Sequence, residues 1–242
     1  MTMQIRLEPL TPTSPHLGDA VRVYADTWRR NHDRAREFVV DYGTQQPDFY
    51  GFVALDDLRV VGMAFGTRSQ PGQWWHDKVA AKVGPDHDAL RCAWVLTELA
   101  VSPRYRHKGV GTRLHDALLK AQPYRHVLLS TQAENWGARR LYERLGWRYL
   151  IRRIRFEPGT SEFVVMYRTL NPQSLAGEAE PCAEEPRDRP RRAVRPRLPP
   201  QRLPGRSGRR RRADQTASSA GRDAVRCRVR DGEAPRIPGR NL

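Results

Sequence analysis

The sequence predicts an α/β domain with a mixed sheet, followed by a disordered tail. Helical patterns alternate with short β-branched and aromatic runs along residues 1–171, and every Trp, Tyr and Phe lies within them. Residues 172–242 hold 18 Arg, no Lys and no aromatic residue. Without large apolar side chains, a segment cannot bury enough surface to offset an ordering cost of about 1–2 kcal/mol per residue. We therefore expect one domain over residues 1–171 and an Arg/Pro-rich disordered tail over residues 172–242.

The composition of the chain excludes several classes of protein. No window of 18 apolar residues exists in the 242 residues, so no membrane span is expected. The N-terminus lacks the basic-then-apolar pattern of a secretion signal. The three cysteines, at positions 92, 182 and 227, have no metal-binding spacing, so no metal is expected. A cytoplasmic location is the default expectation.

Periodicity predicts the elements of the first half of the domain. Apolar residues recur at helical spacing between Leu17 and Trp28. Two β-rich runs flank Asp56 and Asp57 and predict a hairpin. The elements expected here are a strand over residues 4–7, helices over residues 17–28 and 34–42, and strands over residues 49–55 and 58–66. Residues 67–91 show no clean period and predict a long loop.

Strands and helices alternate through the second half. A strand is expected over residues 94–101, a helix over residues 109–121 and a strand over residues 127–131. Asn135 is placed to cap a further helix, which Gly146 ends. Strands over residues 147–151 and 162–167 close the domain, so the expected order is β-α-α-β-β-β-α-β-α-β-β.

Residues 96–111, L-T-E-L-A-V-S-P-R-Y-R-H-K-G-V-G, predict an anion site where a strand runs through a basic loop into a helix. The first amides of a helix lack intrahelical partners, and the helix dipole favours negative charge there. Gly109 and Gly111 have no Cβ, so a pyrophosphate can approach their backbone closely. The surrounding positive charge comes from Arg104, Arg106, Lys108 and Arg113. The P-loop pattern is absent, and the dinucleotide pattern fails at its third glycine.

Three motifs carry a resemblance to a known family. Residues 106–111, R-H-K-G-V-G, match the coenzyme A loop pattern [R/Q]-x-x-G-x-[G/A], and residues 98–103, E-L-A-V-S-P, precede it. Residues 135–147 read N-W-G-A-R-R-L-Y-E-R-L-G-W. On these motifs, residues 4–170 resemble the GCN5-related N-acetyltransferase (GNAT) superfamily. The resemblance implies a mostly antiparallel mixed sheet, flanked by helices, whose central parallel strands splay apart.

The resemblance also implies a reaction and its residues. The expected activity is direct transfer of an acetyl group from acetyl-CoA to a primary amine within a ternary complex. Glu98 would act as the base, either directly or through a water, and Tyr142 would protonate the leaving thiolate. The base role requires a pKa for Glu98 raised toward about 6–7 by partial burial. The expected cofactor-binding residues are Leu99, Ala100, Val101, Arg106, His107, Lys108, Gly109, Val110, Gly111, Thr112 and Asn135.

Each of these residues also has a simpler structural interpretation. Glu98 could be a structural carboxylate paired with an arginine, Tyr142 could be core packing, and Asn135 could be only a helix cap. His76 could border the acceptor pocket beside Trp74 and Trp75, or be a satisfied structural histidine. Surface positions are expected for His107 and His115.

The acceptor stays open at this point. The predicted loop over residues 67–91 is expected to border its site together with the first two helices. Acidic side chains that could attract a cationic amine are Asp33, Glu37, Asp41 and Asp48, although a solvated helix face also explains them. Polyamines, aminoglycosides, amino acids, small toxic amines and protein amines are all compatible with the sequence.

Two other classes of function remain as alternatives. One is a non-catalytic module that binds or senses coenzyme A. The other is a nucleic-acid-associated protein that acts through its basic tail, where residues 209–212 are four consecutive arginines. That tail could equally be a solvated extension or a stretch translated from the wrong frame of GC-rich DNA. A homodimer is an analogy with the superfamily rather than a reading of the surface.

Overall fold

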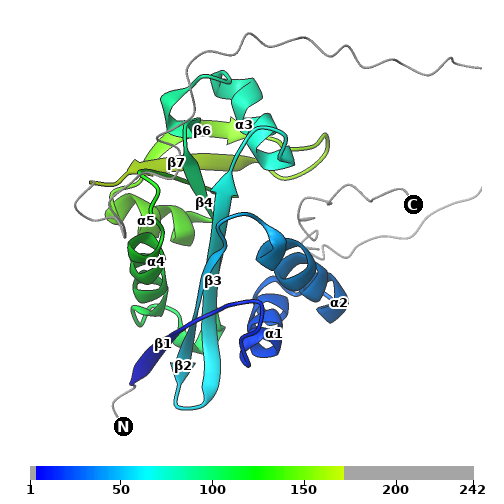
Figure 1. Ribbon diagram of the computed structural model, residues 1–242, viewed down its shortest axis with the longest axis vertical. Helices are drawn as coiled ribbons and strands as arrows, with labels where there is room; N and C mark the ends of the chain where they lie inside the picture. The colour runs from blue at the N-terminus through cyan, green and yellow to red at the C-terminus, as the bar shows by residue number, and fades with distance from the viewer. Residues whose placement is uncertain (1–3, 172–242) are drawn as a thin grey trace, which may run out of the picture. The chain divides into compact units, whose positions relative to one another are not determined.

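The computed structural model describes residues 4–171 and arranges them as one seven-stranded sheet with helices against it (Figure 1). The strands are β1 (Ile5–Pro9), β2 (Tyr50–Asp56), β3 (Arg59–Ser69), β4 (Ala93–Val101), β5 (His126–Gln132), β6 (Arg148–Ile154) and β7 (Phe163–Thr169). The helices are α1 (Leu17–Trp28), α2 (His32–Arg36), α3 (Trp74–Val83), α4 (Val110–Ala121) and α5 (Trp136–Arg144). Short helical turns are η1 (Glu37–Tyr42), η2 (Gly43–Gln45), η3 (Asp88–Leu90) and η4 (Pro103–Tyr105). The predicted tail lies outside the described residues, so its boundary near residue 171 stays a prediction.

The sheet has the order β1-β2-β3-β4-β5-β7-β6. Every neighbouring pair is antiparallel except β4 and β5, which are parallel. The predicted mixed, mostly antiparallel sheet is therefore confirmed. None of the described helices is long and apolar enough to cross a membrane.

The two parallel strands pair only at their beginnings. Residues Ala93, Trp94 and Val95 of β4 face residues of β5, and no β4–β5 pair follows within the described chain. Both strands continue, to Val101 and Gln132. The splay expected at the centre of the sheet therefore opens directly after Val95.

A β-bulge in β4 coincides with the start of this splay. Phe65 of β3 pairs with Glu98 and Gly66 pairs with Leu96, so Thr97 has no partner residue on β3. A Cβ on Gly66 would lie 2.3 Å from the carbonyl oxygen of Val95. Only glycine allows β3 to approach β4 this closely next to the bulge.

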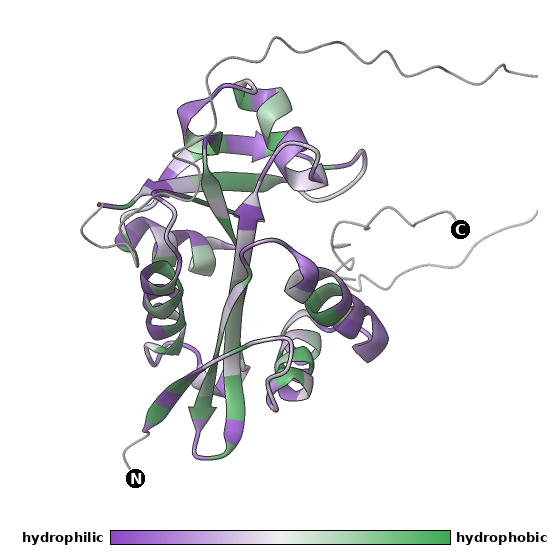
Figure 2. Ribbon diagram, in the orientation of Figure 1, coloured by the Kyte–Doolittle hydropathy of each residue, from purple (hydrophilic) through white to green (hydrophobic). Residues whose placement is uncertain are grey.

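The helices cover both faces of the sheet. Val110, Leu114 and Leu118 of α4 enter one core cluster with Tyr142 of α5, whereas α1 and η1 pack into a second cluster. α3 joins a third cluster with β5, β6 and β7. Figure 2 shows hydrophobic and hydrophilic segments side by side along α4, as expected for an amphipathic helix.

The prediction of a loop over residues 67–91 was wrong. α3 and η3 lie within this range, after the end of β3. The buried residues of α3 are His76, Val79 and Ala80, at helical spacing, and Gly84 follows the helix with φ +99°. The first position of this buried face is a histidine, and the flanking glycines suggested turns throughout, which hid the helix. All other predicted elements are present with ends shifted by a few residues.

Candidate active site

A cavity of about 320 Å³ opens between β4 and β5 where the strands have separated. Its walls include β4 from Val95 to Leu99 and β5 from Leu129 to Gln132. α5 contributes Asn135, Ala138 and Tyr142, and the remaining walls come from α1, η1, β3, α3 and the β6–β7 connection. The splayed strands therefore create a space that is lined by both the sheet and the helices packed against it.

Glu98 lines this cavity from β4 and is only partly exposed. Its Oε1 accepts hydrogen bonds from the indole Nε1 of Trp28, at 3.1 Å, and from the amide of Leu99, at 2.9 Å. Neither donor is an arginine, so the expected alternative of an arginine-paired structural carboxylate is not what the structure contains. The carboxylate is held in place by two neutral donors.

Burial in the cavity wall raises the pKa of Glu98 from 4.5 to about 7. The hydrogen bonds from Trp28 and Leu99 act in the opposite direction, because they favour the ionised form. A carboxyl with this pKa exchanges a proton near neutral pH.

Tyr142 is buried on α5 and also lines the cavity. Burial raises the pKa of its hydroxyl well above the usual 10, and the negative charge of Glu98 adds to the rise. The phenol therefore keeps its proton at neutral pH. Its ring packs edge-on against Trp147, with ring centroids 5.7 Å apart, so core packing and exposure to the cavity occur in the same side chain.

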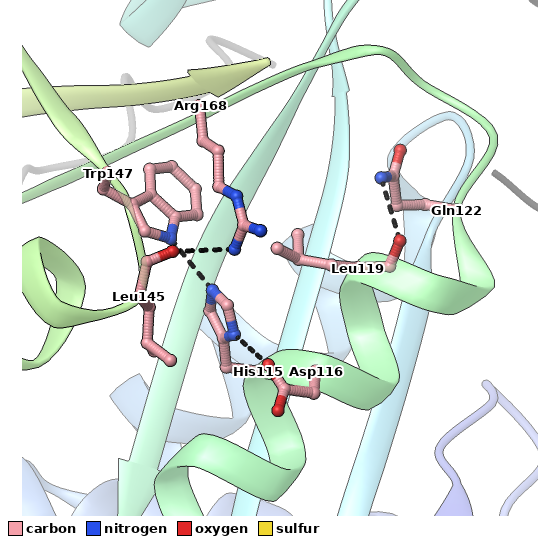
Figure 3. Close-up of polar contacts among 7 residues, drawn as sticks. All are labelled: His115, Asp116, Leu119, Gln122, Leu145, Trp147 and Arg168. Carbon is pink, nitrogen blue, oxygen red and sulfur yellow. Dashed lines mark hydrogen bonds and ion pairs between the residues drawn. The ribbon is translucent and has the colours of Figure 1, made fainter. Parts of the chain in front are cut away.

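His115 corrects the expectation of a surface position, because its side chain is completely buried and its ring centroid lies 6.4 Å from that of Tyr142. Figure 3 shows its contacts with Trp147 and Asp116. Nε2 lies 2.9 Å from the indole Nε1 of Trp147, and Nδ1 lies 2.8 Å from Asp116 Oδ1. Because the indole can only donate, Nε2 must accept and Nδ1 carries the proton. Burial lowers the pKa of His115, although Asp116 opposes this, so the ring is neutral at neutral pH.

The loop before α4 presents an open helix N-terminus. The first backbone hydrogen bond of the helix runs from Arg113 N to Gly109 O, at 3.0 Å. In the described chain, the amides of Val110, Gly111 and Thr112 donate to no backbone carbonyl. Gly109 has φ +80°, and no atom lies within 4 Å of the position of a Cβ. The amides that open α4 therefore have no backbone acceptor, as anion binding at a helix N-terminus requires.

The basic residues of this loop have distinct surroundings. Arg106 turns back, and its Nε donates to the Val101 carbonyl at 3.0 Å. Lys108 Nζ lies 5.4 Å from the centre of the Tyr105 ring. His107, exposed as expected, adopts φ +60°. The loop is therefore tied to β4 while its positive charges remain at the surface.

The remaining expected cofactor residues divide into two groups. Leu99 and Asn135 line the cavity. The side chains of Ala100, Val101 and Val110 are buried in the core, so only their backbone atoms are available to a ligand. Asn135 Oδ1 also accepts from Ala138 N at 3.2 Å, so it caps α5 as well as lining the cavity.

Comparison with known proteins agrees with this geometry. Residues 18–147 match the sequence model of the acetyltransferase (GNAT) family. The chain belongs to the GNAT family. It is 34% identical over 126 residues to the GCN5-like protein acetyltransferase Rv2170 of Mycobacterium tuberculosis. That match covers 48% of this chain and 61% of the relative, so the chain spans less than two thirds of the relative's length.

Solved structures share the GNAT fold. Arabidopsis thaliana NAA60, in complex with acetyl-CoA, aligns with a TM-score of 0.51 at 20% identity, over 69% of this chain and 99% of its own. PH1933 of Pyrococcus horikoshii OT3 aligns with a TM-score of 0.51 at 19% identity, over 69% of this chain and 99% of its own. The matching family model and the Mycobacterium tuberculosis relative are both described as acetyltransferases.

The residues expected to border the acceptor site of this GNAT protein only partly line the cavity. His76 is buried and bonded to Ser69 Oγ at 2.9 Å, and it does not line the cavity, so the structural interpretation of this histidine is correct. Its neighbours Trp74 and Trp75 do line it. The four acidic residues suggested as an attraction for cations do not line it either. Asp33, Glu37 and Asp41 are exposed on α2 and η1, as the solvated interpretation expects, whereas the carboxylate of Asp48 accepts a hydrogen bond from the Tyr124 hydroxyl.

Several residues of this GNAT cavity were missed by sequence reasoning. Trp28, Phe38, Tyr42, Phe156 and Phe163 all line it. Trp28, Phe38 and Tyr42 lie on the first two helical segments, which were expected to border the acceptor site, although these side chains were not singled out. Phe156 and Phe163 were given no role in the site, and no local spacing connects such distant segments. Among residues 4–171, no group of three His, Cys, Asp or Glu side chains is arranged to hold a metal ion.

Proposed function

We propose that this protein transfers the acetyl group of acetyl-CoA directly to a primary amine within a ternary complex. The observation that carries the proposal is the cavity at the splay, because both Glu98 and Tyr142 line it. One group has a pKa near neutrality, and the other keeps its proton there. A proton acceptor and a proton donor at one cavity are what acyl transfer to an amine requires.

The residues present fit acetyl-CoA as the co-substrate. The open amides from Val110 to Thr112 suit the pyrophosphate, and Arg106, His107 and Lys108 line the loop before them. The edge of β4 from Leu99 to Val101 that no longer pairs with β5 would pair with the pantetheine arm, and Asn135, at the N-cap of α5, would contact that arm. The acetyl-CoA complex of NAA60 supports this choice of donor.

The reaction would begin with loss of a proton from the amine. An alkylammonium with a pKa of about 10.4 is almost fully protonated at pH 7, so a base is required. Glu98 would take this proton, directly or through a water. The neutral nitrogen would then attack the thioester carbonyl carbon, and the Tyr142 hydroxyl would protonate the sulfur as the carbon–sulfur bond breaks. The nitrogen, which still carries one proton more than the amide, would lose that proton and the Tyr142 phenolate would regain one, while Glu98 would release its proton to solvent. The products are the N-acetyl amide and coenzyme A with a free thiol.

One contact adds a condition to this sequence of events. The Leu99 amide, a candidate partner for the pantetheine arm or the oxyanion, donates to Glu98 Oε1 at 2.9 Å. Pairing of Leu99 with acetyl-CoA would therefore remove a hydrogen bond that lowers the pKa of Glu98. The carboxylate would become a stronger base once the donor has bound.

Acetyl-CoA binding is tested with a matched pair of glycine variants. Gly109 and Gly159 both have positive φ, and both would place a Cβ in open space. Replacing either by Ala imposes a similar strain of about 1–2 kcal/mol. By calorimetry, Gly109→Ala should weaken acetyl-CoA binding about tenfold or more, whereas Gly159→Ala should leave it unchanged. Equal affinities in the two variants would remove the proposed pyrophosphate site.

The chemical roles are tested with Tyr142→Phe. The variant keeps the packing against Trp147 and loses only the hydroxyl. Turnover should fall about 10²-fold or more, as is typical for loss of a general acid, with the affinity for acetyl-CoA nearly intact. Initial rates with both substrates varied should give intersecting patterns, and mass spectrometry should detect no acetyl-enzyme. An acetylated enzyme, competent to acetylate the amine, would contradict direct transfer.

Three other expectations remain proposals. A cytoplasmic location is the default expectation for this composition, and a homodimer is an analogy with the family. A nucleic-acid role would belong to residues 172–242, outside the described chain. Salt-dependent DNA binding that is equal in the full chain and in a form ending at residue 171 would dismiss such a role.

A further inference from the structure

Resting on the proposed function, we infer that the acceptor is a monoamine carried by a bulky apolar or aromatic group, rather than a polycation. The inference concerns the part of the cavity that is lined by aromatic side chains of α1, η1, α3 and the β6–β7 region. Three features carry it, namely two walls of aromatic side chains, the position of Glu98 beside one of them, and the charges of the lining residues.

Two aromatic walls enclose this part of the cavity. The first aromatic wall is formed by Tyr24, Phe38 and Tyr42, with ring centroids 5.0 Å apart for Tyr24–Phe38 and 6.1 Å apart for Phe38–Tyr42. The second aromatic wall is formed by Trp74, Phe156 and Phe163, with centroids 5.4 Å and 5.3 Å apart in that order. All six side chains line the cavity. Rings that pack on one another in this way present fixed apolar faces to a ligand.

The first aromatic wall adjoins the proposed base. Trp28, on the same helix as Tyr24, donates to Glu98 Oε1 at 3.1 Å. The negative charge of Glu98 also contributes to the raised pKa of Tyr24. These segments, α1 and η1, are separate from the loop that is proposed to hold the pyrophosphate. An amine presented to Glu98 would therefore have the first aromatic wall beside its body.

The charges around the cavity disfavour an acceptor with several ammonium groups. Among residues 4–171, Glu98 is the only acidic residue that lines the cavity, and the lining also includes Arg30 and Arg68. A polyamine needs several carboxylates, because each further ammonium group must be desolvated and paired. One amine fits one carboxylate, and an apolar body fits the aromatic walls.

The aromatic walls would also assist the chemistry. Desolvation of an ammonium group lowers its pKa, so contact with apolar rings increases the fraction of neutral, nucleophilic amine. An amine with a hydrophilic body would gain less from this effect.

The test compares amines at saturating acetyl-CoA by release of the coenzyme A thiol. The panel is 2-phenylethylamine, tryptamine, n-butylamine, spermidine and a lysine-containing peptide. The two aromatic amines should have a kcat/KM at least about tenfold above that of every other amine, because burial of an aromatic ring supplies that difference readily. Acetyl-CoA binding is measured separately by calorimetry.

Two variants locate the preference in the walls. Phe38→Ala and Trp74→Ala should each raise the KM for 2-phenylethylamine about tenfold, with little change for n-butylamine. Trp136→Ala removes an aromatic side chain that is 61% exposed and does not line the cavity, so it serves as the control. Equal effects of all three substitutions would overturn the inference.

The outcomes separate this inference from the proposed function. Preferred turnover of spermidine or of the lysine peptide would overturn the inference and leave acetyl transfer intact. Acetyl-CoA binding without turnover of either aromatic amine would also overturn it. Failure to bind acetyl-CoA, with no turnover of any amine, would overturn the proposed function as well.

Discussion

The ionisation of Glu98 can be measured in the rate of the enzyme. Glu98→Gln keeps the size of the side chain and removes its ability to accept a proton. With a pKa of about 7, the carboxyl is about 90% ionised at pH 8 and about 10% ionised at pH 6. If Glu98 is the base, the advantage of wild type over the variant should fall about tenfold from pH 8 to pH 6.

The ratio of the two enzymes is the informative quantity. The acceptor amine also loses its proton as pH rises, so the rate of each enzyme increases with pH for that reason alone. This effect is common to both enzymes and cancels in the ratio of their kcat/KM values. The assay is thiol release at several pH values from 6 to 8, with acetyl-CoA affinity measured for each enzyme. A ratio that stays constant over this range would show that Glu98 is not the base.

The same substitution tests the pKa through stability. The pKa of Glu98 rises from 4.5 to about 7 on folding, so its contribution to stability is complete below pH 4.5 and is lost as pH rises through 7. Gln cannot ionise. Glu98→Gln should therefore raise the Tm relative to wild type at pH 8, and the difference should shrink toward pH 5. A larger stabilisation at pH 5 than at pH 8 would contradict the assigned direction of the pKa shift.

Two further predictions concern the support of the site. Gly66→Ala places a Cβ 2.3 Å from a carbonyl oxygen of β4, so it should lower the free energy of unfolding, measured in urea, by about 1–3 kcal/mol. Gly18→Ala is the control, because a Cβ there meets open space and should not lower that free energy. Equal stabilities of the two variants would contradict the close approach of β3 to β4. His115→Phe leaves the indole N–H of Trp147 without its acceptor and should cost about 1–3 kcal/mol. Because the His115 ring packs against that of Tyr142, with ring centroids 6.4 Å apart, His115→Phe should also lower kcat. His115→Gln should restore part of the stability and part of the kcat, and a kcat unchanged in both variants would show that His115 does not position Tyr142.

Local patterns in the sequence predicted most of the fold. The amphipathic spacing of α1 and α4, the turn at Asp56 and Asp57, and the Asn135 cap each depend on residues close together in the chain. The open helix start at Gly109 was predictable for the same reason, since glycine spacing in a basic loop is a local signal. Features set by neighbouring residues can be inferred from one sequence.

Features that depend on tertiary contacts could not be inferred in this way. The surface position expected for His115 failed because its partner Trp147 lies 32 residues further along the chain. The contact between Trp28 and Glu98 spans 70 residues. Sequence alone gives Glu98 as a carboxyl near an expected ligand, and only the fold supplies the indole and the burial that set its pKa.

The bulge at Thr97 explains how the proposed base and acid come to share a cavity. Trp94 and Leu96 face the core cluster of α4 and α5, and strict alternation would point Glu98 the same way. The unpaired residue shifts the alternation by one position, so Leu99 faces that cluster instead. Glu98 and Ala100 consequently face α1, where Trp28 binds the carboxylate.

Glu98 and Tyr142 therefore belong to opposite faces of the sheet, and only an opening through the sheet can expose both to one ligand. The separation of β4 from β5 after Val95 provides that opening. Gly66 lets β3 approach β4 directly before the bulge. It therefore stabilises both the shift in side-chain alternation along β4 and the start of the splay. On this reasoning a substitution at Gly66 should impair turnover beyond its effect on stability, because it displaces the base, the open amides and the cavity at once.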